Sequence, residues 1–252
     1  MKAQRLRVQF TRGDDLKYVT HLDMMRFWER ALRRADVPIA YSEGFSPHPQ
    51  IALAAPLAVG VTSEAELLDV FLDRPMPPAE FRERLTAQLP PAVRIIKVTE
   101  VGVNLPSMQA EIKAAEYLVD VALDAPTAAA TFDGPGPSNA PPDAPADETA
   151  VRERIARFMA SETFPWEHKR EDEVRSYDLR AMVHELAVAG ASDGRLTLRM
   201  LLRNDNAGSG RPEQVALALG LGQPLRIHRT RLVLPERSQA LAAWRERGRF
   251  SE

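Results

Sequence analysis

The stretch from Thr20 to Pro49 concentrates the side chains whose types and spacing could do chemistry. His21 stands where a strand pattern gives way to a helix pattern, and a histidine there could act as a general acid or base near neutral pH. Asp23 follows it, and His48 lies between prolines that confine its backbone to an extended geometry. His21, Asp23 and His48 are therefore catalytic candidates. The alternative is structural: His21 is partly buried at the helix start, and Asp23 caps the helix together with Thr20.

Arginines form a row on the helix that this stretch predicts. They recur at helical spacing opposite the apolar stripe, at Arg26, Arg30, Arg33 and Arg34. A guanidinium can donate two parallel hydrogen bonds to phosphate oxygens, so such a row suits a nucleic-acid backbone. The alternative is a solvated helix face on which Glu29 pairs with Arg33.

An aromatic, proline-stiffened loop follows the arginine row, with the sequence YSEGFSPHPQI from Tyr41 to Ile51. Aromatic and histidine rings stack on unpaired bases, a mode of recognition that suits ferredoxin-like sheets. The alternative is a rigid turn in which Phe45 plugs the edge of a sheet. The row and the loop together predict a surface for RNA or a partner protein, made of Arg26, Arg30, Arg33, Arg34, Tyr41, Phe45 and His48.

Other motifs narrow the chemistry further. The chain has no cysteine, which excludes disulfides, thiolate zinc sites, cysteine nucleophiles and a cysteine-ligated iron–sulfur cluster within it. The histidines lack metal-ligand spacing, and P-loop, Rossmann and nucleophile-elbow fingerprints are absent. We therefore predict no metal and no cofactor on this chain. Tyr177, Asp178 and Arg180 could form a polar site, or a turn with a local ion pair between Asp178 and Arg180.

Composition and charge are those of an ordinary globular protein. Hydrophobic residues make up 44% and charged residues 27% of the 252 positions, and the net charge is −2. Residues 1–48 hold 9 Lys or Arg against 6 Asp or Glu, a mild basic bias that falls short of a strong nucleic-acid footprint. The apolar runs are too short to span a bilayer, and the N-terminal segment lacks a signal peptide's apolar core. We therefore expect a cytoplasmic protein with no membrane partner.

The periodicity of apolar residues predicts the strands and helices that carry these side chains. The predicted elements follow a similar order in the two halves of the chain. The first half predicts strand, helix, two strands, helix and strand, over residues 5–12, 20–36, 50–59, 66–73, 77–89 and 93–101. The second half repeats this order around a strand at 163–170, over residues 115–124, 148–161, 182–190, 194–203, 211–221 and 225–234. The pattern predicts an α+β fold with two tandem ferredoxin-like (βαββαβ) units.

The domain boundaries follow from this order and from one shift in composition. Residues 1–104 are expected to form the first unit, and residues 105–235 the second. The Ala-, Pro- and Asp-rich segment 124–149 cannot bury enough apolar surface to offset its ordering entropy, and we expect a disordered insertion there. Residues 236–252 predict a short C-terminal tail helix.

Most of the chain outside the 124–149 segment also resembles a known family, the bacterial radical-SAM-linked (radical-SAM-associated) proteins, a domain of unknown function. Their hallmark is SHLD, then an RALRRA helix, then YSxGFxPHPxIxxAxPLxxGxxSxxEYxD. Here Thr20 replaces the first serine and Leu67 the tyrosine near the end. The matching positions include His21 to Asp23, Arg30 to Ala35, Tyr41, Ser42, Gly44, Phe45, Pro47, His48, Pro49, Pro56, Leu57, Gly60, Ser63, Glu64 and Asp69.

This resemblance implies a partner rather than a reaction. The domain is found fused to, or encoded beside, a radical S-adenosylmethionine enzyme, and the cysteines that bind the cluster belong to that enzyme. The element order is also similar to that of CRISPR repeat-processing endonucleases and tRNA pseudouridine synthases, although the catalytic motif of the synthases is missing here.

We therefore expect an accessory, RNA-binding protein that works with a radical S-adenosylmethionine enzyme in rRNA or tRNA modification or processing, rather than an enzyme in its own right. One alternative is a stand-alone RNA-processing enzyme that uses His21 and His48. A second is a pure protein-docking domain for the radical enzyme.

Overall fold

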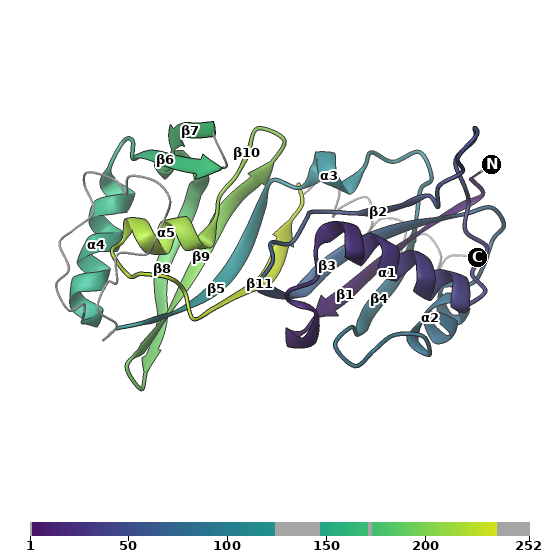
Figure 1. The fold of residues 1–252 in the computed structure, drawn as a ribbon, viewed down its shortest axis with the longest axis horizontal. Coiled ribbons are helices and arrows are strands. Elements are labelled where there is room, and N and C mark those ends of the chain that lie inside the picture. The colour runs from purple at the N-terminus through teal and green to yellow at the C-terminus, as the bar shows by residue number, and fades with distance from the viewer. Residues whose placement is uncertain (1, 124–146, 171–172, 236–252) are drawn as a thin grey trace, which may run out of the picture. The chain divides into compact units, whose positions relative to one another are not determined.

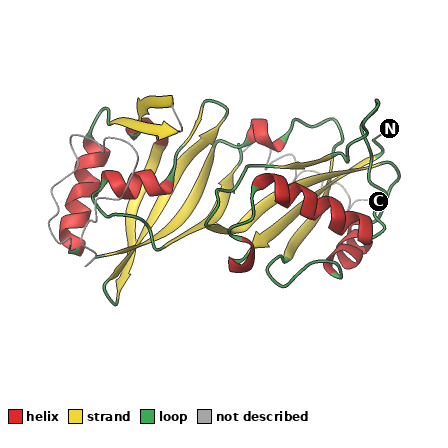
Figure 2. Cartoon of the chain, viewed as in Figure 1, coloured by secondary structure: helices red, strands yellow, loops and turns green. Residues whose placement is uncertain are grey.

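A computed structural model describes residues 2–123, 147–170 and 173–235 of the chain. These residues form a mixed α/β protein with few helices and mostly antiparallel strands (Figures 1 and 2). They divide into two compact units: unit 1 holds the residues up to Lys113 together with those from Arg231, and unit 2 holds Ala114–Thr230. None of the described helices is long and apolar enough to cross a membrane.

Unit 1 contains four neighbouring strands and two main helices. Its elements are β1 (Gln4–Arg12), η1 (Asp14–Leu16), α1 (His21–Arg34), β2 (Ile51–Leu53), β3 (Val61–Leu72), α2 (Pro78–Thr86), β4 (Ile95–Val101) and α3 (Met108–Glu111). The strands lie in the order β2-β3-β1-β4, and each neighbouring pair is antiparallel. β1 is therefore a central strand with a partner along both edges.

The core of unit 1 lies on one face of this sheet. Leu6, Val8 and Phe10 are every second residue of β1, and all three are buried. Every second side chain of a strand points to the same face of its sheet, and here that face is covered by helices. They share an apolar cluster with buried residues of both helices, among them Trp28 of α1 and Phe81 of α2. The rings of Phe10 and Trp28 meet edge to face at 4.7 Å, so α1 is docked on β1 through an aromatic contact.

Helix α1 begins and ends where the sequence indicates. Thr20 is its N-cap, and the Thr20 hydroxyl oxygen accepts a hydrogen bond from the Asp23 amide. After Arg34 the chain leaves the helix at Asp36, whose φ of 52° places it in the left-handed region. Pro38 then prevents the helix from continuing. These local signals set the bounds of the helix that carries the exposed arginines.

Unit 2 repeats much of this layout. Its elements are β5 (Ala114–Ala122), α4 (Glu148–Ala160), β6 (Pro165–Arg170), β7 (Glu173–Asp178), η2 (Arg180–Met182), β8 (Val183–Ser192), β9 (Arg195–Asp205), β10 (Gly208–Ser209), α5 (Pro212–Ala218) and, as far as Thr230, β11 (Arg226–Val233). Strands β8, β9, β5 and β11 lie side by side in that order, and β10 also pairs with β9. Strands β6 and β7 form a separate hairpin.

Several expected boundaries differ from the structure. The strand expected over 50–59 is confined to Ile51–Leu53, because the chain turns away through Pro56 and Gly60, which has a φ of 88°. Residues 173–180, for which a turn was one of two alternatives, form β7 as far as Asp178, since this segment pairs with β6. The tail helix expected at 236–252 lies outside the described residues, as does the expected insertion up to residue 146.

Replacing Trp28 with Ala tests the aromatic docking of α1. The change removes a fully buried ring from the core, and we expect it to lower the free energy of unfolding by about 3–5 kcal/mol. Leu22→Ala on the same helix is the matched control, because Leu22 is exposed and its loss should change stability by less than about 0.5 kcal/mol. Urea unfolding followed by circular dichroism measures both, and equal losses would contradict this account of the core.

Candidate functional site

The arginine row lies on the exposed face of α1, as its spacing predicts. Arg26, Arg30, Arg33 and Arg34 are all exposed. Arg26 pairs with Asp23 at 3.3 Å, and Arg34 donates a hydrogen bond to the Gln88 carbonyl oxygen at 3.1 Å. The side chains of Arg30 and Arg33 make no hydrogen bond or ion pair with any residue that the structure describes. Their guanidinium groups are therefore available to an outside partner.

The loop from Tyr41 to Pro49 is a closed hairpin rather than a loose connection. Tyr41 and Pro49 form an antiparallel bridge, and the Ser42 amide donates to the His48 carbonyl oxygen at 2.9 Å. The His48 amide donates in return to the Ser42 hydroxyl oxygen at 2.9 Å. Gly44 has a φ of 117°, a conformation that L side chains rarely adopt, and thus allows the tight tip.

This hairpin presents its aromatic ring to solvent. Phe45 has a relative exposure of 109%, so its ring packs against nothing. The alternative in which Phe45 plugs the edge of a sheet is therefore wrong. Tyr41 and His48 are also exposed. A ring held out on a bonded hairpin is the arrangement of a contact residue rather than of core.

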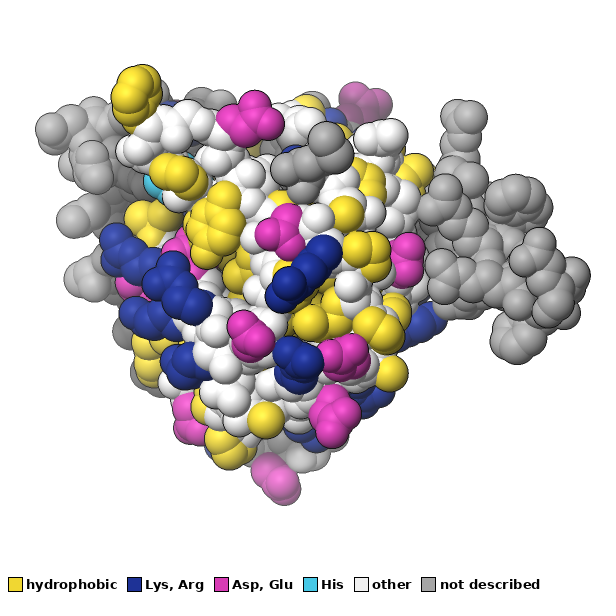
Figure 3. All heavy atoms as spheres, turned by 90° about the vertical axis from the view of Figure 1, so that its right-hand side faces the viewer, with side chains coloured by type: hydrophobic (Ala, Val, Ile, Leu, Met, Phe, Trp, Pro, Cys, Tyr) yellow, Lys and Arg dark blue, Asp and Glu magenta, His cyan; other side chains and the backbone are white. Residues whose placement is uncertain are grey.

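The space-filling view shows how side-chain types gather on one face of the molecule (Figure 3). A group of Lys and Arg side chains occupies one side of this face, with hydrophobic side chains and histidine above it. The described part of unit 1 supplies such residues from α1 and from the hairpin that follows the helix. Positively charged and hydrophobic side chains thus lie near one another on this face.

His21 and Asp23 lie at the first turn of α1, apart from the hairpin in sequence and in bonding. His21 lines a small enclosed space with Arg12 and Glu66, while Asp23 faces solvent. No hydrogen bond or ion pair of the described residues joins any two of the side chains of His21, Asp23, Tyr41 and His48. General acid–base chemistry that combines His21 with His48 therefore gains no support from this geometry.

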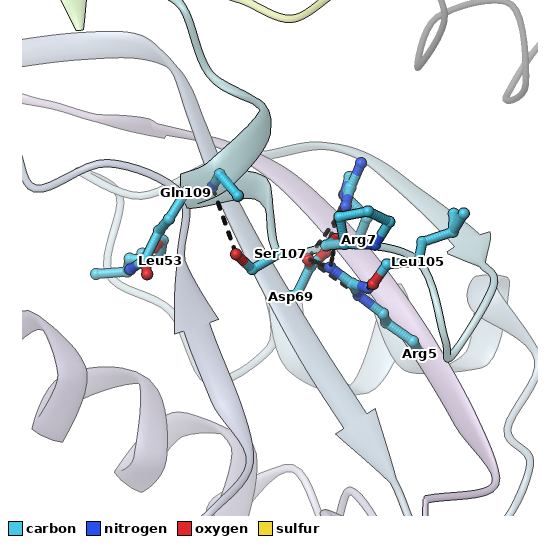
Figure 4. Close-up of polar contacts among 9 residues, drawn as sticks. Arg5, Arg7, Leu53, Asp69, Leu105, Ser107 and Gln109 are labelled. Carbon is cyan, nitrogen blue, oxygen red and sulfur yellow. Dashed lines mark hydrogen bonds and ion pairs between the residues drawn. The ribbon is translucent and has the colours of Figure 1, made fainter. Parts of the chain in front are cut away.

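Sequence analysis missed a cluster of buried charge on the other face of the unit 1 sheet. Arg5 and Arg7 both donate to the Asp69 carboxylate, Arg5 through Nε and Nη2 and Arg7 through Nε at 2.9 Å (Figure 4). Arg5 has a relative exposure of 2% and Asp69 of 1%. The antiparallel register places Arg7 directly opposite Asp69, and Arg5 reaches the same carboxylate diagonally. One buried and one partly buried cation thus share one buried anion.

The cluster is tied to the segment that leads into α3. The Arg5 guanidinium also donates to the carbonyl oxygens of Leu105 and Pro106, at 2.7 and 3.1 Å. The side-chain amide of Gln109 donates through Nε2 to the Leu53 carbonyl oxygen at 3.0 Å, so the same segment is attached to β2. The one sequence signal for this charge cluster is the alternation of Arg5 and Arg7 with the apolar Leu6 and Val8. The same alternation is typical of a strand with one solvated face, so it does not indicate that the arginines are covered.

The polar residues expected around Tyr177 serve the packing of unit 2. The Tyr177 hydroxyl donates to the Gln214 side-chain oxygen of α5, and burial raises the pKa of Tyr177 to about 12. Asp178 accepts from the Phe164 amide at 2.7 Å and from the Arg180 amide at 3.0 Å. The Arg180 side chain donates to backbone carbonyls of Met159 and Val183, so no ion pair joins it to Asp178. The described residues contain no group of three acidic or histidine side chains that could hold a metal ion.

One family matches most of the chain. The family model described as "Uncharacterized protein conserved in bacteria (DUF2344)" matches residues 5–212, which include the arginine row, the hairpin and the buried charge cluster. The chain belongs to this family. None of the curated proteins matches the chain.

Solved structures show a distant likeness over most of the chain. A chain described as "Crystal structure of the archaeal box H/ACA sRNP Nop10-Cbf5 complex" is 12% identical with a TM-score of 0.42, over 92% of this chain and 48% of that chain. A chain from "Crystal Structure of a Cbf5-Nop10-Gar1 Complex" is 10% identical with a TM-score of 0.46, over 92% and 49%. This chain therefore spans about half the length of the solved structures that it matches, and a likeness of this degree carries no argument about function.

The pKa of Asp23 depends on the side chains around the start of the arginine row. The Thr20 hydroxyl, which donates to Asp23 Oδ2 at 2.7 Å, holds the pKa of Asp23 below its ordinary value, and the charges of Arg26 and Arg30 act in the same direction. Because the folded pKa is lower than the unfolded one, this interaction stabilises the fold above the unfolded pKa. The contribution is lost as the pH falls through the folded pKa.

Thr20→Val tests this assignment. The variant keeps the shape of the side chain and removes the hydroxyl, so we expect the pKa of Asp23 to rise toward its ordinary value. Arg26→Gln should raise the same pKa as well, because it removes both a charge and a hydrogen bond from Asp23. A pH titration by NMR of the Asp23 carboxyl carbon in the three proteins measures both changes, and an unchanged pKa in Thr20→Val would contradict the assignment.

Proposed function

We propose that the chain is an accessory RNA-binding protein that works with a radical S-adenosylmethionine enzyme in the modification or processing of rRNA or tRNA. The observation that carries the proposal is the exposed face of α1, where the side chains of Arg30 and Arg33 make no hydrogen bond or ion pair with the described residues. A guanidinium that is not used internally keeps its donors for phosphate oxygens, and each phosphate contact releases counterions from RNA.

The hairpin adds a second kind of contact to the charged face. Phe45 is fully exposed on a backbone that the Ser42 and His48 bonds hold in place. A pre-ordered ring loses little conformational freedom on binding, and base–aromatic stacking is tolerant of sequence. Charge along the helix and stacking at the hairpin together suit a single-stranded or looped RNA better than a duplex.

We further propose that the two units are tandem ferredoxin-like units. The support is the order of strands: in unit 1 the fourth, first, third and second strands of the unit lie side by side as β4-β1-β3-β2. In unit 2 the corresponding strands lie in the same order as β11-β5-β9-β8, with the β6–β7 hairpin as an addition. Helices α1 and α2 follow the first and third strands of unit 1, as the βαββαβ pattern requires.

The radical enzyme is proposed as partner on two grounds. The residues from His21 to Asp69 resemble the radical-SAM-linked proteins, and the chain has no cysteine with which to bind a cluster itself. Exposed apolar side chains at Tyr18, Leu22 and Val59 provide a surface of the kind that proteins use for docking. A hydrogen bond from the Gly60 amide to the Lys17 carbonyl oxygen, at 2.7 Å, brings two of these backbone segments together.

A triple variant, Arg26→Gln, Arg30→Gln and Arg33→Gln, tests the charged face. For single-stranded RNA, the slope of log affinity against log salt should flatten by about 0.7 for each lost phosphate contact, or about 2 in total. The control changes Arg152 and Arg157, exposed arginines of α4 in unit 2, to Gln and should leave the slope unaltered. Fluorescence anisotropy over a range of salt concentrations measures the slopes.

Phe45→Ala separates stacking from charge in the same assay. The loss of a stacked base should weaken RNA binding by about 1–3 kcal/mol with almost no change of slope. If the triple variant keeps the wild-type slope, the arginine row is a solvated helix face and the RNA proposal fails.

A protein-docking domain without RNA is the second candidate function, favoured by the exposed apolar residues at the start of α1. On this account Leu22→Asp should weaken co-purification with the co-expressed radical enzyme by at least about tenfold, because a buried unpaired charge at an interface costs several kcal/mol. Binding of the unaltered chain should survive 0.5 M salt, unlike RNA binding. Equal binding by Leu22→Asp and the unaltered chain would remove this candidate.

A further inference from the structure

A cavity of about 240 Å³ lies beside the buried charge cluster of unit 1. β1 and β3 supply Arg5, Asp69 and Phe71 to its wall, and Lys2, two residues before β1, also lines it. The segment from Val103 to Gln109, which includes Ser107, supplies the facing wall. All of these residues belong to unit 1, so the cavity is complete within one compact body.

The charges around the cavity do not balance. The carboxylate of Asp69 faces two guanidinium groups, those of Arg5 and Arg7, so the cluster has a net charge of about +1 at the protonation states usual at pH 7. Lys2 adds a further positive charge, with its ammonium 4.2 Å from the centroid of the Phe71 ring. Asp69 is the one acidic residue among the described residues that line the cavity. Excess positive charge on a buried guanidinium and an exposed ammonium side by side attracts an anion.

One donor of the buried Arg5 side chain remains for that anion. A guanidinium carries five N–H groups. Those of Arg5 donate from Nε to Asp69, from Nη2 to Asp69 and to the Pro106 carbonyl oxygen, and from Nη1 to the Leu105 carbonyl oxygen. The second N–H of Nη1 has no partner among the described residues, although Arg5 is 2% exposed and lines the cavity.

Ser107 provides a second donor on the facing wall. Its hydroxyl oxygen accepts a hydrogen bond from the Ala110 amide at 3.4 Å, as the N-cap of α3. The hydroxyl proton is therefore free to point elsewhere, because a serine hydroxyl donates and accepts at once. Apolar side chains of Leu53, Leu105 and Met108 complete the wall.

We propose that this cavity binds a compact organic anion, a carboxylate or phosphate monoester carried on a small apolar body. The anionic oxygens lie toward Lys2, the free N–H of Arg5 and the Ser107 hydroxyl, and the apolar body lies against Leu53, Leu105 and Met108. A volume of 240 Å³ is below the range of about 300–1,000 Å³ that suits drug-sized ligands, so the body is no larger than about one aromatic ring with a short substituent. This site is separate from the α1 face that carries the proposed RNA function.

Isothermal titration calorimetry of the full chain tests the site with benzoate and phenyl phosphate as probes. At least one of these anions should bind saturably, whereas benzyl alcohol, which has a similar body and no charge, should bind at least about tenfold more weakly. A stronger response to benzoate identifies a carboxylate ligand, and a stronger response to phenyl phosphate identifies a phosphate monoester. Absence of saturable binding by both anions, or equal binding by benzyl alcohol, overturns the proposal.

Lysine variants connect the binding to this cavity. Lys2→Gln keeps most of the side chain and removes the charge, and should weaken binding of the better anion by about tenfold or more. Lys17→Gln is the matched control, since Lys17 also lies over an aromatic ring, at 5.4 Å from the centroid of Tyr18, but does not line the cavity. Equal weakening by the two variants overturns the assignment.

A steric variant keeps the test independent of charge. Leu105→Trp should fill the cavity and abolish binding, while an unchanged circular dichroism spectrum shows that the chain still folds. Retained binding in this variant also overturns the assignment. Because Arg30 and Arg33 are untouched, RNA affinity should be unchanged in both Lys2→Gln and Leu105→Trp, so failure here is distinguishable from failure of the RNA proposal.

Discussion

The alternation of side chains along β1 is the constraint on which unit 1 depends. Even-numbered residues from Leu6 to Phe10 point into the apolar core, and Arg5 and Arg7 point to the opposite face. The apolar side fixes α1 through the contact of Phe10 with Trp28, which leaves the arginine row outward. The charged side holds Asp69 of β3 and the segment that precedes α3. One strand thus positions both the proposed RNA surface and the proposed anion cavity.

Much of this arrangement could be predicted from the sequence because it is local. The capping of α1 by Thr20, the exposure of the arginines and the tight hairpin with Gly44 each follow from residues within a few positions of one another. Strand β7 could not be predicted, because its charged and polar residues give no apolar alternation and only its pairing with β6 makes it a strand. The sequence allows Phe45 to be either a contact residue or a plug for the sheet edge, since exposure of a single Phe is a tertiary property.

The buried charge cluster shows where sequence reasoning ends. Arg5, Arg7 and Asp69 are more than 60 residues apart between the two strands, and nothing local indicates that they meet. An arginine next to buried leucine in a strand is ordinarily solvated, so its burial depends on a cover that arrives from a third segment, at Leu105 and Pro106. The cavity depends on the same three segments and is therefore equally non-local.

The shared carboxylate of Asp69 also bears on how faithfully the chain folds. A slip of one residue between β1 and β3 would turn Arg5 and Arg7 toward the helices and send Leu6 and Val8 to the far side. Two guanidinium groups would then enter an apolar interior without an anion, a state whose desolvation cost far exceeds the loss of a few apolar contacts. A shifted pairing of β1 with β3 is thus disfavoured more strongly than it would be if β1 carried only apolar residues. The charge cluster therefore helps to specify the register of the central strands.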